Sequence, residues 1–350
     1  MAFSPAALLE ALSQRLRGSR LRVLAPIRRV QQNLERVLAD GHPEDHANDH
    51  RAVEEWHEID GATFGSVVYL PKDASAKSNT LVLFIPGNPG LPHFYLPLMR
   101  DIVRRFGAHH EVRSLSHAGH YMPSKNKGKV FDLRHQYELK IAYVRQRIEQ
   151  NPALQLVLVS HSIGAYLMLE IMKAFPDHIA KAVFMQPTFH RIGDSAKGVS
   201  MRPLFTHRHH SVKLIDVVAY LTPLWLRRWI AHHAVGSVNE PVFVDVSVAL
   251  VDRTVMLNVL HMAHQEMRDV GDVDAETLRK HEHKTLIVYS PIDGWVPNEF
   301  VQMFQLEFPN AKHRVIPQGH GFMVEPNGSR DMAAHIAQWV ADVLHEDTQS

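Results

Sequence analysis

Ser162 lies in a short segment whose residue types and spacing could make it a nucleophile. An apolar run over residues 154–159 predicts a strand buried on both faces, and the apolar pattern over residues 166–172 predicts a helix soon after it. Only Ser160-His161-Ser162-Ile163-Gly164 remains to make the turn. A strand that turns directly into a helix around a serine is typical of the nucleophile elbow, which exposes the hydroxyl for attack on a carbonyl carbon.

The residues that flank Ser162 fit this interpretation with one departure. So tight a turn needs small residues two positions before and two positions after the nucleophile, and the usual pattern is G-x-S-x-G. Gly164 matches the pattern, whereas Ser160 adds a Cβ that could tighten the turn or shift Ser162. The simpler alternative is that Ser162 only caps the following helix, because serine is favoured at that position.

A second loop offers groups that could stabilise negative charge on a substrate. Acyl transfer passes through a tetrahedral oxyanion, which needs backbone N–H donors already aimed at it. Residues 81–85 predict a buried strand, and the sharp loop Pro86-Gly87-Asn88-Pro89-Gly90 follows it. We assign Asn88 as one donor, because Gly87 lets the backbone approach and Pro89 has no N–H, and Ile163 would be the other. The alternative is an ordinary turn, in which these residue types are common.

A candidate acid and a candidate base follow two later strands. Asp293 comes after a predicted strand at residues 285–289, where a carboxylate can orient an imidazole, although a turn residue is the local alternative. His320 lies between two glycines after the last predicted strand, at residues 313–316. The three residues therefore appear in the order Ser, Asp, His at strand ends, which is typical of α/β-hydrolases. We predict a catalytic triad of Ser162, Asp293 and His320.

The other apolar runs predict a mostly parallel sheet flanked by helices. Antiparallel strands are expected at residues 57–59 and 64–70, further strands at 111–116 and 179–185, and helices from about residue 93 and over residues 133–150 and 330–344. Strands that alternate with helices indicate parallel pairing with right-handed crossovers. The fold class is therefore α/β, and the arrangement expected is an α/β-hydrolase core formed by residues 51–187 and 284–350.

Residues 188–283 interrupt this alternation and predict an inserted helical cap. A cap over the strand ends would supply an apolar pocket, for which Leu224 and Trp225 are candidates. One alternative is that this apolar segment contacts a lipid surface, with Arg227 and Arg228 at the head groups, and another is ordinary core packing. His117 and His120 follow the strand at residues 111–116 and are further pocket candidates, although single histidines are more often loop residues.

Composition excludes several classes of function. The chain has 350 residues, of which 45% are hydrophobic, and a net charge of +1, which argues against a nucleic-acid partner. It has no cysteine, so disulfides and thiolate catalysis are excluded. No histidine cluster has the H-E-x-x-H spacing of a metalloprotease, so we predict no metal and no cofactor. The clusters weighed are His207, His209 and His210, His232 and His233, and His281 and His283.

The first 50 residues form a basic arm with apolar residues near helical spacing. Three interpretations remain open: two amphipathic helices docked on the core, a helix on an anionic lipid surface, and an organelle transit peptide. The chain has no run of about 20 apolar residues and no secretory signal at its N-terminus. We therefore expect a cytoplasmic protein, with association to a lipid droplet or membrane surface as a further possibility.

Several ordered motifs resemble the lipid droplet-associated hydrolase family. They are L-F-I-P-G-N-P-G-L-P-H-F-Y, L-S-H-A-G-H, V-L-V-S-H-S-I-G-A-Y, Q-P-T and Y-S-P-I-D-G-W-V-P, and the resemblance runs from about residue 80 to the C-terminus. It implies an α/β-hydrolase on lipid droplets, with sterol esters or other neutral lipids as the proposed substrates. By motif, Ser162 would be the nucleophile, Asp293 the acid and His320 the base. The family normally carries G-H-S-I-G, so Ser160 departs from it, and the resemblance is poorer in the insertion that holds the family's droplet-targeting segment.

These observations support a leading hypothesis and two alternatives. The first is a serine esterase or lipase that cleaves carboxylic esters of neutral lipids or sterols through an acyl-enzyme. The second is a protein that binds lipid droplets or membrane surfaces and retains the hydrolase scaffold with little turnover, which the departure at Ser160 and the bulky insertion would explain. The third is another reaction of the same fold, such as thioester cleavage or acyl transfer.

Overall fold

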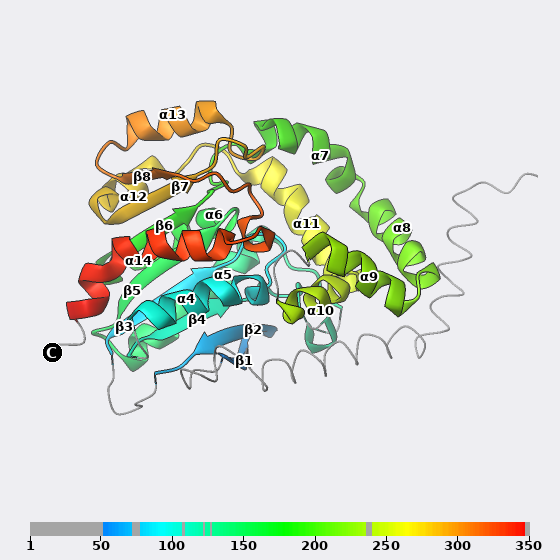
Figure 1. The fold of residues 1–350 in the computed structure, drawn as a ribbon, viewed down its shortest axis with the longest axis horizontal. Helices are drawn as coiled ribbons and strands as arrows, with labels where there is room; N and C mark the ends of the chain where they lie inside the picture. The colour runs from blue at the N-terminus through cyan, green and yellow to red at the C-terminus, as the bar shows by residue number, and fades with distance from the viewer. Residues whose placement is uncertain are drawn as a thin grey trace, which may run out of the picture.

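Eight strands form a single sheet at the centre of the protein (Figure 1). The structure is a computed structural model that describes residues 52–71, 78–106, 109–121, 123–126, 128–235 and 240–346. The strand order is β1-β2-β4-β3-β5-β6-β7-β8; β2 pairs antiparallel with β1 and β4, and every other neighbouring pair is parallel. The prediction of a mostly parallel sheet is confirmed. The strands are β1 (Ala52–Ile59), β2 (Ala62–Tyr69), β3 (Thr80–Ile85), β4 (Glu111–Leu115), β5 (Gln155–His161), β6 (Ile179–Met185), β7 (Thr285–Tyr289) and β8 (Lys312–Val315).

Helices cover both faces of the sheet, because strands such as β3 are buried at every position and apolar from Leu81 to Ile85. Side chains alternate between the two faces of a strand, so Val82 and Phe84 join one apolar cluster while Leu83 and Ile85 join the other. The first cluster buries residues of α4 (Leu96–Phe106), α9 (Leu224–Val235), α10 (Pro241–Ala249) and α14 (Gly328–Glu346). The second buries residues of α5 (Leu133–Gln150), α6 (Gly164–Ala174), α12 (Ala275–Lys280) and α13 (Asn298–Glu307), together with Met262 of α11 (Arg253–Asp269).

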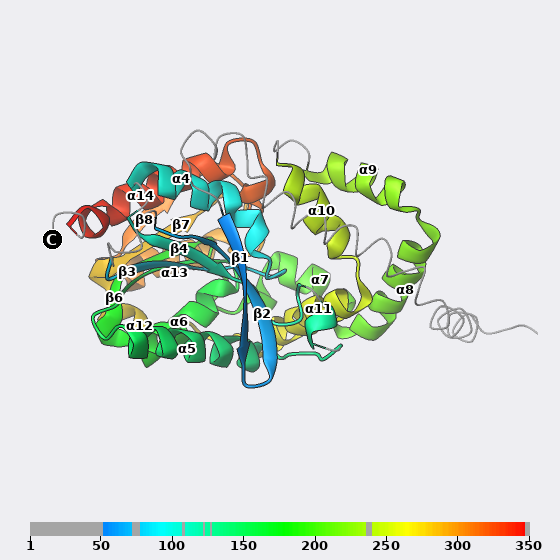
Figure 2. The same cartoon turned by 90° about the horizontal axis from the view of Figure 1, so that it is seen from below.

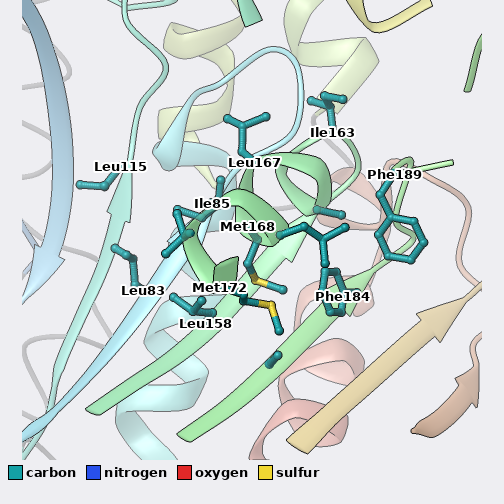
Figure 3. Close-up of a cluster of buried hydrophobic side chains, with 14 of the residues drawn as sticks. Leu83, Ile85, Leu115, Leu158, Ile163, Leu167, Met168, Met172, Phe184 and Phe189 are labelled. Atoms are coloured by element: carbon teal, nitrogen blue, oxygen red, sulfur yellow. The ribbon is translucent and has the colours of Figure 1, made fainter. Parts of the chain in front are cut away.

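A cluster of buried hydrophobic side chains surrounds the junction of β5 and α6 (Figure 3). Leu167, Met168 and Met172 of α6 pack among Leu158 of β5 and Phe184 of β6, and all five are fully buried. Complete burial of such a side chain contributes about 1.5–3 kcal/mol each. This packing fixes the direction in which the chain leaves β5 and therefore the place of the turn that carries Ser162.

Every element that the structure describes between β6 and β7 is helical. In Figures 1 and 2, α8 and α9 lie at the end of the molecule opposite α13 and α14. The longest helix of this segment, α11, is instead bonded to the core: Asn258 accepts a hydrogen bond from the backbone of Phe131 (2.9 Å), and Gln265 accepts one from Leu133 (2.7 Å). The helices are α7 (Ala196–Thr206), α8 (Arg208–Leu221), α9 (Leu224–Val235), α10 (Pro241–Ala249), α11 (Arg253–Asp269) and α12.

Short 3₁₀ turns complete the described fold, at Pro92–Tyr95, Pro123–Asn126, Pro176–His178, Ile192–Asp194, Glu282–Lys284 and Phe322–Val324. The predicted basic arm over residues 1–50 lies outside the described residues. Within the ranges that are described, no helix has both the length and the apolar character needed to cross a membrane. Helix α13 begins at Asn298, directly after Pro297.

Candidate active site

Ser162, His320 and Asp293 form a continuous series of hydrogen bonds. His320 Nε2 lies 2.8 Å from Ser162 Oγ, and His320 Nδ1 lies 2.7 Å from Asp293 Oδ2. The second carboxylate oxygen, Asp293 Oδ1, accepts a hydrogen bond of 2.8 Å from the backbone N–H of Trp295. Three residues that are distant in the sequence therefore meet because β5, β7 and β8 are parallel and end at the same edge of the sheet. The structure brings together all three side chains that the sequence predicted.

The backbone at Ser162 has the strained geometry of a nucleophile elbow. Its φ of 53° lies in the left-handed region, which costs a residue other than glycine about 1–2 kcal/mol. Two hydrogen bonds hold it there: the Ser162 N–H donates to Met185 O (3.1 Å), and Ser162 O accepts from the Thr188 N–H (3.2 Å). The helix after it begins at Gly164 without any side-chain cap, so the alternative that Ser162 serves as a helix cap is wrong.

Two glycines allow the elbow and the Pro86–Gly90 loop to touch. A Cβ on Gly164 would lie 2.3 Å from the carbonyl oxygen of Ile85, which is too close for any residue with a side chain. A Cβ on Gly87 would lie 3.0 Å from Ser162 Cβ, which is tighter than ordinary contact. The close approach that the sequence suggested for Gly87 is therefore present, and it places this loop beside the serine.

Ser160, where the usual elbow has glycine, is the last but one residue of β5. Its hydroxyl donates a 3.3 Å hydrogen bond to the backbone oxygen of Val183 on the neighbouring strand β6, and the residue is fully buried. The hydrogen bond between Ser162 and His320 has a normal length, so the extra Cβ does not separate these residues.

We expect Ser160→Gly to lower stability without changing the reactivity of Ser162. The loss of the bond to Val183 costs about 0.5–1.5 kcal/mol, and a glycine in a strand costs about 0.5–1 kcal/mol more. Urea denaturation would measure the loss of stability, and the rate of labelling by a fluorophosphonate would measure reactivity. A rate increase of about tenfold, equal to about 1.4 kcal/mol in the barrier, would mean that Ser160 does displace the nucleophile.

The two backbone groups assigned to the oxyanion are not engaged elsewhere. The backbone N–H groups of Asn88 and Ile163 donate no hydrogen bond to any of the described residues. The neighbouring N–H of Gly87 is engaged, because it donates to the hydroxyl of Tyr95 at 3.1 Å. This difference favours Asn88 over Gly87 as the donor from this loop.

The side chain of Asn88 is held by the helical segment. Its Nδ2 donates to Val259 O (3.0 Å) and to Glu266 Oε1 (2.8 Å), both on α11. Glu266 is buried, and burial raises the pKa of its carboxyl to about 7, while the hydrogen bond from Asn88 acts in the opposite direction. The sequence gave no sign of Glu266, because its partner lies 178 residues away.

The four predicted pocket residues fall into two groups. His117 and His120 are buried behind the Pro86–Gly90 loop, where the Gly90 N–H donates to His120 Nδ1 (3.0 Å) and the His117 N–H donates to Gly90 O (3.0 Å). They support the loop, and neither makes a hydrogen bond with the Ser162 series. Leu224 packs partly buried against the core, whereas Trp225 is 69% exposed and therefore belongs to the outer surface of α9.

A buried glutamine supports the loop that carries His320. Gln186 follows β6 with a φ of 45°, and its Nε2 donates to the backbone oxygens of Gln318 (3.1 Å) and Gly319 (2.8 Å). Glu325 Oε1 accepts from the Gly319 N–H at 2.9 Å. The loop before His320 is therefore held from both sides, and sequence reasoning missed this support.

None of the histidine clusters weighed in the sequence forms a metal site in the described part of the chain. There, the structure contains no group of three or more His, Cys, Asp or Glu side chains placed to hold a metal ion. The ring centroids of His207 and His210 lie 6.4 Å apart, and those of His232 and His233 lie 5.7 Å apart.

Solved structures with the same architecture share little sequence with this chain. A membrane phospholipase A described as a bacterial virulence factor matches 97% of this chain and 98% of its own, with a TM-score of 0.58 at 15% identity. A carboxylesterase of Nitrososphaera gargenis matches 84% of this chain and 100% of its own, with a TM-score of 0.56 at 13% identity. These likenesses show the fold alone. With its parallel sheet and its serine at a strand-to-helix turn, the protein is an α/β-hydrolase.

The sequence places the chain in one family of this class. A profile of the family described as Lipid-droplet associated hydrolase matches residues 78–323, so the chain belongs to the lipid droplet-associated hydrolase family, as its motifs implied. The relative from Gallus gallus is 28% identical over 292 residues, which are 79% of this chain and 89% of the relative. The relative from Homo sapiens is 27% identical over 298 residues, or 79% and 88% of the two chains.

Proposed function

We propose that this protein cleaves carboxylic esters of lipids by a serine acyl-enzyme mechanism. The observation that carries the proposal is the hydrogen-bonded series from Ser162 through His320 to Asp293, beside the unengaged N–H groups of Asn88 and Ile163. A nucleophile, a base, an orienting carboxylate and two oxyanion donors are the parts that acyl transfer requires.

Each part has a role in the proposed reaction. Ser162 Oγ attacks the acyl carbon while His320 Nε2 takes its proton, and the carbonyl oxygen becomes an oxyanion that accepts from Asn88 and Ile163. The intermediate then expels the alcohol, which takes the proton from His320, and leaves an acyl group on Ser162. Water repeats the sequence and releases the acid. Asp293 keeps His320 in the tautomer with hydrogen on Nδ1 and stabilises its charged form.

A lipid substrate is supported by the family and by the apolar character of the helical segment. The relatives carry the name lipid droplet-associated hydrolase. In the sequence, α8 and α9 with their bulky apolar residues are inserted between β6 and β7, and the loops that follow these two strands are part of the site. Thioester cleavage or acyl transfer would use the same five groups. A panel from short esters to triacylglycerols, sterol esters and acyl thioesters would rank these substrates.

A fluorophosphonate probe tests the mechanism directly. The probe reacts only with an activated serine, so mass spectrometry should find one adduct, on Ser162. The folded state of the same sample should be checked by circular dichroism. A folded protein that forms no adduct and hydrolyses no ester would favour the alternative function, lipid binding with little turnover.

A specific surface supports lipid binding in addition to hydrolysis. We define the apolar face as the seven large hydrophobic residues of α8 and α9 that are 47–72% exposed: Leu214, Val218, Tyr220, Leu221, Trp225, Trp229 and Ile230. Exposed apolar clusters of this kind mark interaction sites, and tryptophan suits the interface between water and lipid. We propose that this face docks on the surface of lipid droplets.

The bonds of Arg227 and Arg228 argue against the role at lipid head groups that the sequence offered as an alternative. Arg227 donates to the backbone oxygens of Thr222 (2.8 Å) and Ala219 at the end of α8, and Arg228 pairs with the buried carboxylate of Asp245. Both guanidinium groups are therefore engaged within the protein, and the proposed attraction to lipid is apolar.

Serine at both Trp225 and Trp229 is expected to weaken lipid binding at least about tenfold. Each indole would bury on the order of 100 Å² in lipid, which is worth about 2.5 kcal/mol. Flotation with triolein droplets coated with phosphatidylcholine would measure binding, and hydrolysis of a short soluble ester should stay unchanged. Leu306→Ser is the matched control, because Leu306 is 83% exposed on α13 at the other end of the protein. Equal losses in both variants would contradict a role specific to the apolar face.

A further inference from the structure

His161 lies directly before the nucleophile, and the proposed reaction gives it no role. It is the last residue of β5, it is 5% exposed, and its ring makes two hydrogen bonds. Nδ1 lies 2.8 Å from the hydroxyl of Tyr95, and Nε2 lies 2.9 Å from the backbone oxygen of His320. The same tyrosine hydroxyl accepts the N–H of Gly87 at 3.1 Å. A chain of three hydrogen bonds therefore connects the Pro86–Gly90 loop with the backbone of His320.

Only one arrangement of hydrogen atoms satisfies all three of these hydrogen bonds. The His320 carbonyl oxygen can only accept, so His161 Nε2 must donate, and Nδ1 of the neutral ring is the acceptor for the Tyr95 hydroxyl, which itself accepts from Gly87. The hydrogen of the neutral imidazole then lies on Nε2, and it donates to the carbonyl oxygen of His320. Donor and acceptor roles are thus ordered in one direction along all three bonds.

The environment keeps both rings in these states. Burial, with the charge of the nearby His320 as a smaller cause, holds the pKa of His161 well below its ordinary value, so the imidazole stays neutral. Burial likewise raises the pKa of Tyr95, so its hydroxyl keeps its hydrogen. The His161 ring also packs 4.9 Å from the His320 ring and meets the Phe322 ring at 89°, which restricts its rotation.

We propose that Tyr95 and His161 are positioning residues that hold His320 and the Pro86–Gly90 loop, which carries the oxyanion donor Asn88, at a fixed separation. The inference rests on the proposed function, because acyl transfer requires the base and the oxyanion donors to be at a defined distance from each other. His320 comes from the loop after β8, and Asn88 comes from the loop after β3. Among the described residues, the three hydrogen bonds through Tyr95 and His161 connect these two loops without involving Ser162. Neither positioning residue touches the reacting atoms.

Two pairs of variants test the inference. Tyr95→Phe removes both bonds of the hydroxyl and keeps the ring, and Tyr143→Phe is its control, because Tyr143 is also buried and its hydroxyl accepts from Arg147 (3.0 Å) on the far side of the sheet. His161→Leu removes the donor to His320, and His161→Gln supplies an amide N–H in its place. Fluorophosphonate labelling and the kcat and KM for a short ester would be measured on each folded variant.

We expect Tyr95→Phe and His161→Leu to lower kcat and the labelling rate about 10- to 100-fold, the size expected for small misplacements of reacting groups. The KM should stay within about twofold, since substrate contacts are unchanged. His161→Gln should recover most of the rate, and Tyr143→Phe should match the wild type. If Tyr95→Phe does not fold, the His161 pair decides alone.

Two negative results have different meanings. A wild-type protein that is labelled, with Tyr95→Phe and His161→Leu labelled equally fast, would overturn the positioning role and leave the proposed function intact. A folded wild-type protein that is not labelled would overturn the proposed function, and the positioning role with it. A drop in melting temperature with unchanged labelling of the folded fraction would also overturn the inference, because it would show a structural role only.

Discussion

Replacing Ser162 by alanine is expected to lower ester hydrolysis by at least about 10⁴-fold and to abolish labelling by a fluorophosphonate. The change removes the atom that would form the acyl-enzyme. It leaves His320, Asp293 and the N–H groups of Asn88 and Ile163 in place, so a small residual rate from oriented water is expected. Stability should fall by no more than about 0.5–1.5 kcal/mol, the contribution of the lost bond to His320, because alanine keeps the backbone bonds that hold the left-handed φ.

Ser160→Ala is the matched control for this variant. It removes a buried hydroxyl two residues earlier, on β5, and that hydroxyl bonds to Val183 and not to His320. Hydrolysis of a short ester and the mass of the adduct should match the wild type. If Ser162→Ala retained a substantial fraction of the activity, another nucleophile would have to be sought, and the serine mechanism would fail.

The sequence predicted best those elements that carry both an apolar pattern and a clear boundary. The helix over residues 133–150 was predicted with both of its ends, and the structure shows Asp132 as its N-cap, accepting the N–H of His135 at 2.8 Å. The strands at residues 179–185 and 285–289 were also predicted with their observed bounds, because they are short apolar runs bounded by polar residues or prolines. In both cases the local signal and the tertiary contacts point to the same structure.

Predictions were poorer where the deciding partner is distant in the sequence. The full extent of α13 was missed, because within it only Val301 and Phe304 are buried, too few for a helical pattern. Arg227 and Arg228 looked like exposed cations, since neither the end of α8 nor Asp245 can be recognised locally as a partner. Adjacent charges on a helix give no information about which partner folding will bring to them.

The same distinction applies to the candidate site. Ser162, Asp293 and His320 each follow a strand, and parallel strands bring such positions to one edge, so chain order alone was enough to propose them. Their supporting residues have no such rule. Glu266 contacts Asn88 over a separation of 178 residues, and His161 contacts the backbone of His320 over 159. Side chains that hold a site in place are recognised only after the fold is known.

Asp293→Asn is expected to lower kcat about 10⁴-fold with little change in KM. The reason lies in the two partners of this carboxylate. The Trp295 N–H needs an acceptor, so the amide oxygen of asparagine should keep the place of Oδ1. The amide nitrogen then faces His320 Nδ1, where the carboxylate had accepted. It can only donate, so His320 must carry its hydrogen on Nε2, where it cannot take the proton of Ser162.

This orientation makes the prediction sharper than a loss of charge alone. If the loss of charge were the whole effect, a second change that only lets the amide of the asparagine turn over would not restore the rate. A wrong tautomer is instead relieved by any change that lets the amide turn over, so folded Asp293→Asn combined with Trp295→Pro, which removes the N–H, should recover part of the rate. Asp272→Asn is the matched control, because that carboxylate pairs with Arg191 on the surface. A rate for Asp293→Asn within about tenfold of the wild type would mean that Asp293 does not set the tautomer of His320.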